Sequence, residues 1–264
     1  MNNTTPTPSP IPPQIPTPGM PVPVLAPLGE NPQEREPLPH VVATIESMLR
    51  QPRRVMYQLR QPGSGRVVLG MVVASICCSL IYGVVVGTFS MGEQLWAAPV
   101  KIAGGLLFAA VLCLPSLYIF TCLSGSQARL SEICGLLAGL LMLMTILLIG
   151  FAPVAWLFSQ STESVTWMGV LHLAFWSIAT LFGLRFLETG FSHTQARSSA
   201  GLNVWIIIFL LVAVQMTTAL RPIVGKASTF FPTEKKFFVT HWGDCLSASP
   251  WEVRTPPRVE PKSP

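Results

Sequence analysis

Long apolar runs without charged residues alternate along this chain with short polar connections. Five runs lack Asp, Glu, Lys and Arg and are long enough to cross a bilayer, because about 20 residues at about 1.5 Å each cover a hydrocarbon core of about 30 Å. None shows the alternation of a barrel strand. The pattern predicts an all-α membrane protein, a bundle of five transmembrane helices over residues 67–88, 102–123, 133–158, 164–186 and 202–220. The third run, of 26 residues, is too short for two crossings, and we expect one tilted or kinked helix.

The segment before the first run is rich in proline, with 13 prolines in residues 1–39. Proline lacks a backbone donor and favours the extended polyproline II conformation, so this segment is predicted to be a disordered, semi-stiff arm. The PxxP spacing of Pro10, Pro13 and Pro16 raises the alternative that the arm docks on an aromatic groove of a protein partner. Because such spacing is nearly unavoidable in so proline-rich a stretch, a simple tether is favoured.

Apolar positions recur at helical spacing after the arm and predict an amphipathic juxtamembrane helix over 40–62, interrupted at Pro52. The apolar stripes consist of Val41, Val42, Ile45, Met48 and Leu49, and of Val55, Met56 and Leu59. The polar side carries Arg50, Arg53, Arg54 and Arg60. Two interpretations remain open: the helix lies on an anionic leaflet, or it packs against the cytosolic ends of the spans.

The connection over residues 89–101 has the signature of a short helix. Ser90 followed by Glu93 three residues later is a capping box, which predicts a helix over 91–98 that Pro99 ends. We expect this helix to lie at the membrane interface on the outer face.

Charged and aromatic residues at the ends of the runs suit membrane anchoring. Trp96 is expected at headgroup depth, Lys101 marks the start of the second span, and Arg185 and Arg221 can extend to the headgroups. A binding site in the first connection, with Glu93 and Lys101, is the alternative to this structural role.

Composition and charge support a membrane protein and its orientation. Half of the 264 residues are hydrophobic and 11% are charged, against roughly 25% in a typical soluble domain. The first 30 residues lack both the basic start and the apolar block of a signal peptide, so we expect the first span to drive insertion. Bases cluster before this span, which orients the N-terminus to the cytosol and argues against nucleic-acid binding. Five crossings then place the tail 221–264 outside, although it begins with Arg221, Lys226, Lys235 and Lys236.

A few polar or helix-breaking residues lie inside the runs and are candidates for function. His172 is the one imidazole well inside a span, and Gln215 lies in the fifth. Intramembrane ionisable groups are functional candidates by default, but a hydrogen bond between helices is the favoured role for both residues. Pro115 and Pro153 predict kinks, which can form a transporter site or be structural. No internal repeat is evident, so structural kinks are favoured.

The chain offers little chemistry for catalysis. There is no CxxC pair and no zinc-type spacing of Cys and His, so we expect no cofactor and no metal. The sequence "HWGDC" over 241–245 holds nucleophile-type residues, but three residues so close in sequence rarely converge on one substrate. No predicted span contains Asp or Glu. We therefore expect a protein that is not an enzyme.

Four stretches resemble an uncharacterised group of bacterial multi-pass membrane proteins: "YGVVVGTFSMGEQLWAAPVK", "PSLYIFTCLSGS", "GFAPVAWLFSQST" and "QMTTALRPIVG". The similarity covers roughly residues 82–225. It implies about five spans and a bacterial cytoplasmic membrane, and brings no activity, substrate or catalytic residue. In layout alone the chain also looks like the Yip superfamily, whose architecture does not establish a function.

Two functions follow as expectations. The first is a non-enzymatic scaffold whose bundle anchors the arm to the bilayer and which organises the membrane or anchors partner proteins of unknown identity. The second is a small transporter or channel with a site near His172 and the kinks at Pro115 and Pro153. No oligomeric state follows from the sequence.

Overall fold

The structure, a computed structural model, describes residues 26–89, 94–161, 165–194 and 196–219. All the regular elements within these residues are helices, which confirms the all-α fold class. They are α1 (Pro32–Arg35), α2 (Val41–Arg50), α3 (Pro52–Leu59), α4 (Gly65–Thr88), α5 (Gln94–Leu123), α6 (Leu130–Ser161), α7 (Val165–Ser192) and α8 (Ala200–Ala219).

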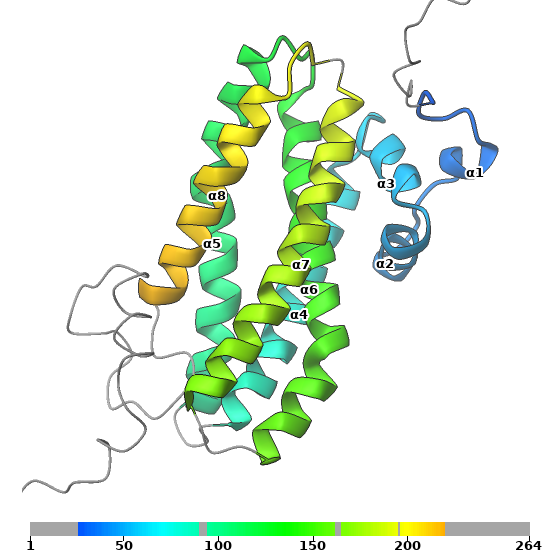
Figure 1. Cartoon of the computed structure of the whole chain (residues 1–264). Coiled ribbons are helices and arrows are strands. Elements are labelled where there is room, and N and C mark those ends of the chain that lie inside the picture. The colour runs from blue at the N-terminus through cyan, green and yellow to red at the C-terminus, as the bar shows by residue number, and fades with distance from the viewer. Residues whose placement is uncertain (1–25, 90–93, 162–164, 195, 220–264) are drawn as a thin grey trace, which may run out of the picture.

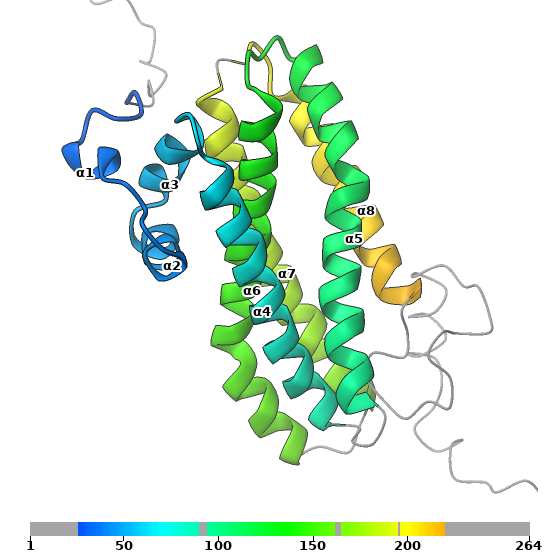
Figure 2. The same ribbon diagram turned by 180° about the vertical axis from the view of Figure 1, so that it is seen from behind.

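The five longest helices form an antiparallel bundle, and α1 to α3 lie beside its upper half in the view of Figure 1. We call residues 26–60 the cap. The end of the bundle with the connections 61–64, 124–129 and 193–199 is the cap end, and the opposite end is the far end. Helix α6 packs against α4 and α7, while α5 packs against α4 and α8 (Figures 1 and 2).

Four helices, rather than the five predicted, are long and apolar enough to cross a membrane. These spans are Gly65–Thr88, Leu95–Leu123, Leu130–Ser161 and Trp167–Ser192. The fifth helix is also apolar, but its described apolar stretch, Ala200–Met216, is shorter. At 1.5 Å per residue this stretch rises only about 26 Å, which is less than the hydrocarbon core. By helix composition the chain is a polytopic membrane protein.

Small residues on α6 make room for neighbouring side chains. Leu59 of the cap lies over Gly135, and Phe186 of α7 lies over Gly139, so closely that a Cβ added to either glycine would overlap with the side chain above it. The four-residue spacing of these glycines on one face of α6 allows both neighbours to approach closely. The core of the molecule therefore follows α6, the helix with the largest buried share of its span.

The prediction that Pro99 ends a short helix is wrong. Helix α5 begins at Gln94 and continues through Pro99 and Pro115 to Leu123. Pro99 is only the sixth residue of α5, so it removes one hydrogen bond near the helix start. Its ring and backbone pack directly on Gly83 of α4, which stabilises the helix pair. Ser90 and Glu93 of the predicted capping box lie outside the described residues.

The cap corrects a second prediction, that the arm extends to residue 39. Residues 26–39 pack on α3 and contain helix α1, which begins after Asn31. The predicted break at Pro52 is confirmed: Gln51 leaves the helical region, with φ −141° and ψ 64°, and Pro52 is the first residue of α3. The remainder of the predicted arm, residues 1–25, lies outside the described residues.

Candidate functional site

His172, the main candidate from the sequence, lies buried in α7 near the far end. Its Nδ1 atom is 2.8 Å from the hydroxyl oxygen of Tyr82 in α4. The two rings meet edge to face, with centroids 5.8 Å apart. Because α4 and α7 both pack mainly on α6, this hydrogen bond joins two helices that otherwise touch little. The structure thus gives His172 the interhelical contact that the sequence favoured, with a partner 90 residues away.

The second ring nitrogen of His172 has no hydrogen-bond partner among the described residues. A neutral imidazole has one donor and one acceptor nitrogen, so either tautomer leaves Nε2 unsatisfied when Nδ1 bonds to Tyr82. An unsatisfied buried polar atom costs about 1–3 kcal/mol. The site therefore has the capacity for one further polar contact, to a solute, a water molecule or a proton.

The surroundings of this pair are apolar. Met168 and Phe175, one turn before and after His172, are buried, and Phe175 stacks on Phe151 of α6 at 4.7 Å. The described carboxylates of the bundle, Glu132 and Glu188, lie at the cap end. The pair can hold a hydrogen bond but has no carboxylate of α4 to α8 beside it to relay a proton.

Lys101 is buried in α5 on a different side of the bundle. Pro99 faces α4, and two residues turn the helix by about 200°, so Lys101 faces away from α4. Trp205 of α8 donates a 2.9 Å hydrogen bond to the carbonyl of Cys113. Continuing this antiparallel register places Lys101 level with the last turn of α8. A cation suits the end of a helix, where carbonyls lack partners.

The other candidates do not converge on His172. Pro115 and Pro153 lie on the exposed surfaces of α5 and α6, and Gln215 is half-buried near the end of α8. Glu93 and Arg221 lie outside the described residues. No group of three or more His, Cys, Asp or Glu that could hold a metal occurs in the described part of the chain. The structure therefore assembles no shared site from these residues.

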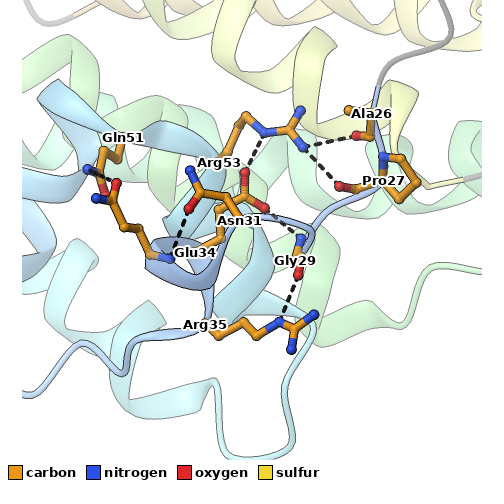
Figure 3. Close-up of polar contacts among 9 residues, drawn as sticks. Ala26, Pro27, Gly29, Asn31, Glu34, Arg35, Gln51 and Arg53 are labelled. Atoms are coloured by element: carbon orange, nitrogen blue, oxygen red, sulfur yellow. Dashed lines mark hydrogen bonds and ion pairs between the residues drawn. The ribbon is translucent and has the colours of Figure 1, made fainter.

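The cap contains a polar cluster that the sequence did not predict. Glu34 is buried and accepts two hydrogen bonds, from Arg53 Nε at 2.7 Å and from the amide of Gly29 at 2.6 Å (Figure 3). Arg53 also donates to the carbonyls of Ala26 and Pro27, at 2.9 and 3.0 Å. The ion pair and these bonds fasten the chain from residue 26 onward to α3.

A second set of donors on α3 holds the segment after α1. Arg54 donates to the carbonyls of Glu36 and Pro37, at 3.1 and 3.0 Å. Gln58 donates to the carbonyl of Glu36 at 3.0 Å. Proline offers a carbonyl acceptor and no amide donor, whereas arginine offers donors only. A proline-rich segment and an arginine-rich helix are therefore complementary.

One titratable group of the cap, Glu34, and one beside the cap, His193, have shifted pKa values. Burial raises the pKa of Glu34, but the hydrogen bonds from Arg53 and Gly29 and the charge of Arg53 outweigh it, so the pKa falls below its usual value. The pKa of His193 is lowered by burial and by the nearby charges of Arg53 and Arg60, against an opposing effect of Glu34. Arg60 donates to the carbonyl of His193, which ties the cap to the end of α7.

One local signal in the sequence could have located α1. Asn31 followed by Pro32 is a typical helix start, because Asn caps the first free amides and Pro fits the first helical position. The Oδ1 atom of Asn31 accepts from the amide of Gln33 at 3.1 Å. The contacts to Arg53 and Arg54 have no such local signal.

Comparison of the chain with protein-family models, with curated proteins and with solved structures gave no match. The resemblance to a bacterial group therefore stays a prediction.

Proposed function

We propose that this protein is a non-enzymatic membrane anchor, whose five-span bundle presents the proline-rich residues 1–25 to a protein partner on the cytosolic side. The observation that supports this proposal is the attachment of residues 26 and 27 to α3. Arg53 binds the carbonyls of Ala26 and Pro27, and Glu34 in turn holds Arg53. The point at which residues 1–25 join the cap is therefore fixed.

The register of α8 supports the fifth crossing. Gly201, near the start of α8, lies against Phe120 and Ser124 at the cap end of α5. The bond from Trp205 to Cys113 carries the same register onward, so the end of α8 is level with Lys101. Helix α8 thus runs beside the greater part of the predicted second span, residues 102–123.

The distribution of bases supports a cytosolic cap. Among the described residues, Lys101 is the one Lys or Arg at the far end, while Arg60, Arg129, Arg185 and Arg197 lie towards the cap end. An excess of Lys and Arg marks the cytoplasmic side of membrane proteins. The resemblance in sequence adds the expectation that this is a bacterial cytoplasmic membrane.

Deletion of residues 1–25 tests the anchor proposal. This deletion keeps residues 26–39, which belong to the cap, and should leave membrane insertion unchanged. Crosslinking followed by affinity recovery from the native membrane should show partners with the full chain and none with the shortened one. Replacing Pro10, Pro13 and Pro16 by Ala in the full chain separates recognition of the PxxP spacing from a general role of the arm. Equal recovery of partners with and without residues 1–25 would contradict the proposal.

A small transporter is the second candidate, and the unpartnered Nε2 of His172 favours it. A solute or proton that pairs with this atom would compensate for its desolvation. The purified protein in liposomes should then move a solute or protons, and His172→Ala should abolish the flux. Tyr82→Phe, which keeps the ring and removes the hydroxyl, is the matched variant. Absence of flux across a broad panel of solutes and of protons would exclude this function.

A further inference from the structure

Helix α2 has three faces: one buried, one exposed and apolar, and one charged. The face turned to the rest of the molecule consists of the buried residues Thr44, Ser47 and Met48. Val42 and Leu49 are 68% and 52% exposed and lie about 100° or more around the helix from Met48. At 100° per residue these two side chains point almost the same way, since they are seven positions apart.

The third face of α2 is charged. Glu46 and Arg50 are exposed and form an i,i+4 ion pair at 3.4 Å. Around the helix, this charged face adjoins one edge of the apolar face, and Val41 and Ile45 lie between the other edge and the buried face. Such an arrangement suits a helix at a membrane interface, with one side on protein, one in the acyl-chain boundary and one towards water.

The apolar face of α2 continues the exposed apolar surface of α4. Val41 of α2 lies over Gly70 of α4, where an added Cβ would come within 3.4 Å of it. Gly70 is one turn past Arg66, the last charge before the first apolar run. The neighbouring Leu69 and Val73 are exposed large hydrophobics on the same helix. In Figure 1, α2 is also the lowest of the three cap helices, nearest the middle of the bundle.

We propose that α2 is embedded in the cap-side leaflet, with Val42 and Leu49 in contact with lipid acyl chains and Glu46 and Arg50 at the headgroups. This inference rests on the membrane insertion of the bundle. It resolves the two alternatives left by the sequence, because the same helix packs on the spans and faces lipid. The cap, to which residues 1–25 are joined, is then held at the membrane surface.

Depth-dependent quenching tests this placement in the full-length protein reconstituted in phospholipid liposomes. A fluorescent non-natural amino acid is introduced at one position at a time: 42, 49, 46 or 73. Quenching is measured with lipids that carry a nitroxide on the acyl chain and, separately, with iodide in the water. Val42 and Leu49 are each more than half exposed, so a label at either position disturbs little packing.

Labels at positions 42 and 49 should be quenched by the acyl-chain nitroxide several-fold more than the label at 46, and iodide should give the reverse order. The label at position 73 reports bundle insertion independently. Lipid quenching at 73 with iodide quenching at 42 and 49 would overturn the placement of α2 alone. Protection of 42 and 49 from both quenchers would also overturn it, since residues 1–25 or a second copy would then cover the face. Iodide quenching at 73 would instead contradict the membrane insertion itself.

Discussion

A single glycine decides how closely α4 and α5 approach. Gly83 leaves room for the backbone of Pro99, so that the two helices pack without an intervening side chain. Pro99, which was predicted to end a helix, instead lies within α5 and forms part of its contact with α4. In a membrane, close backbone approach through small residues is a main source of helix association.

Gly83→Ala should destabilise the bundle by about 1–3 kcal/mol, because the added methyl would come within 2.9 Å of the Pro99 nitrogen and the backbone cannot yield cheaply. Gly104→Ala is the matched control on α5, since nothing lies within 4 Å of its added Cβ. It should be neutral or slightly stabilising through the higher helix propensity of Ala. Thermal unfolding in detergent measures both variants, and equal unfolding temperatures would contradict this packing.

The Tyr82–His172 pair shows which features of a residue contact can be predicted from the sequence and which cannot. An apolar run with one imidazole predicts a buried polar contact, and the structure contains one. The identity of the partner depends on how α4 and α7 are arranged around α6, which no local pattern encodes. The orphaned Nε2 atom likewise follows from the tertiary arrangement.

At the scale of elements, the cap explains why the boundary of the arm was misplaced. Proline content alone predicts an extended, unattached segment up to residue 39. The donors that hold residues 26–37 lie 17 to 27 positions later in the chain, on α3. Arg53 and Arg54 contributed to the predicted orientation of the protein, and the structure gives them a second role in holding this segment. The two amphipathic stripes and the break at Pro52, by contrast, are local features and were predictable.

Glu34→Gln should loosen the cap by about 1–2 kcal/mol at neutral pH, because it removes the charge that holds the partly exposed Arg53. Proteolysis or amide exchange of residues 26–37 measures this opening. Arg35→Gln, which removes only a bond from Arg35 to the carbonyl of Gly29, is the milder comparison. Unchanged protection in the Glu34 variant would show that Glu34 does not hold the cap.

Acid should open the cap in two steps. His193 has a lowered pKa, so its protonation opposes the folded cap once the pH falls below the ordinary pKa of histidine. Glu34 also has a lowered pKa, so its stabilisation is complete above the ordinary pKa of glutamate and is lost as the pH falls through the lower folded value. Amide exchange across pH should lose the upper step in His193→Gln and the lower step in Glu34→Gln. A profile that neither variant changes would contradict both assignments.

At the scale of the whole molecule, the all-α bundle was predictable because apolar runs separated by short connections leave few alternatives in a membrane. The fifth crossing is a proposal, since the described apolar part of α8 is shorter than the four other spans. Its support is the register along α5, from Gly201 near Ser124 to Trp205 at Cys113. The anchor proposal and the lipid-facing α2 both depend on where this bundle places its two ends.

The sidedness of the two chain ends tests this account most directly. A small split-fluorescent-protein tag is added to the N-terminus or to the C-terminus of the full-length protein, and the complementary fragment is expressed in the cytosol. Five crossings with a cytosolic cap predict fluorescence for the N-terminal tag, none for the C-terminal tag, and access of the C-terminal tag to antibody from outside intact cells. Fluorescence from both tags would mean that α8 does not cross, and fluorescence from the C-terminal tag alone would mean that the cap faces outward.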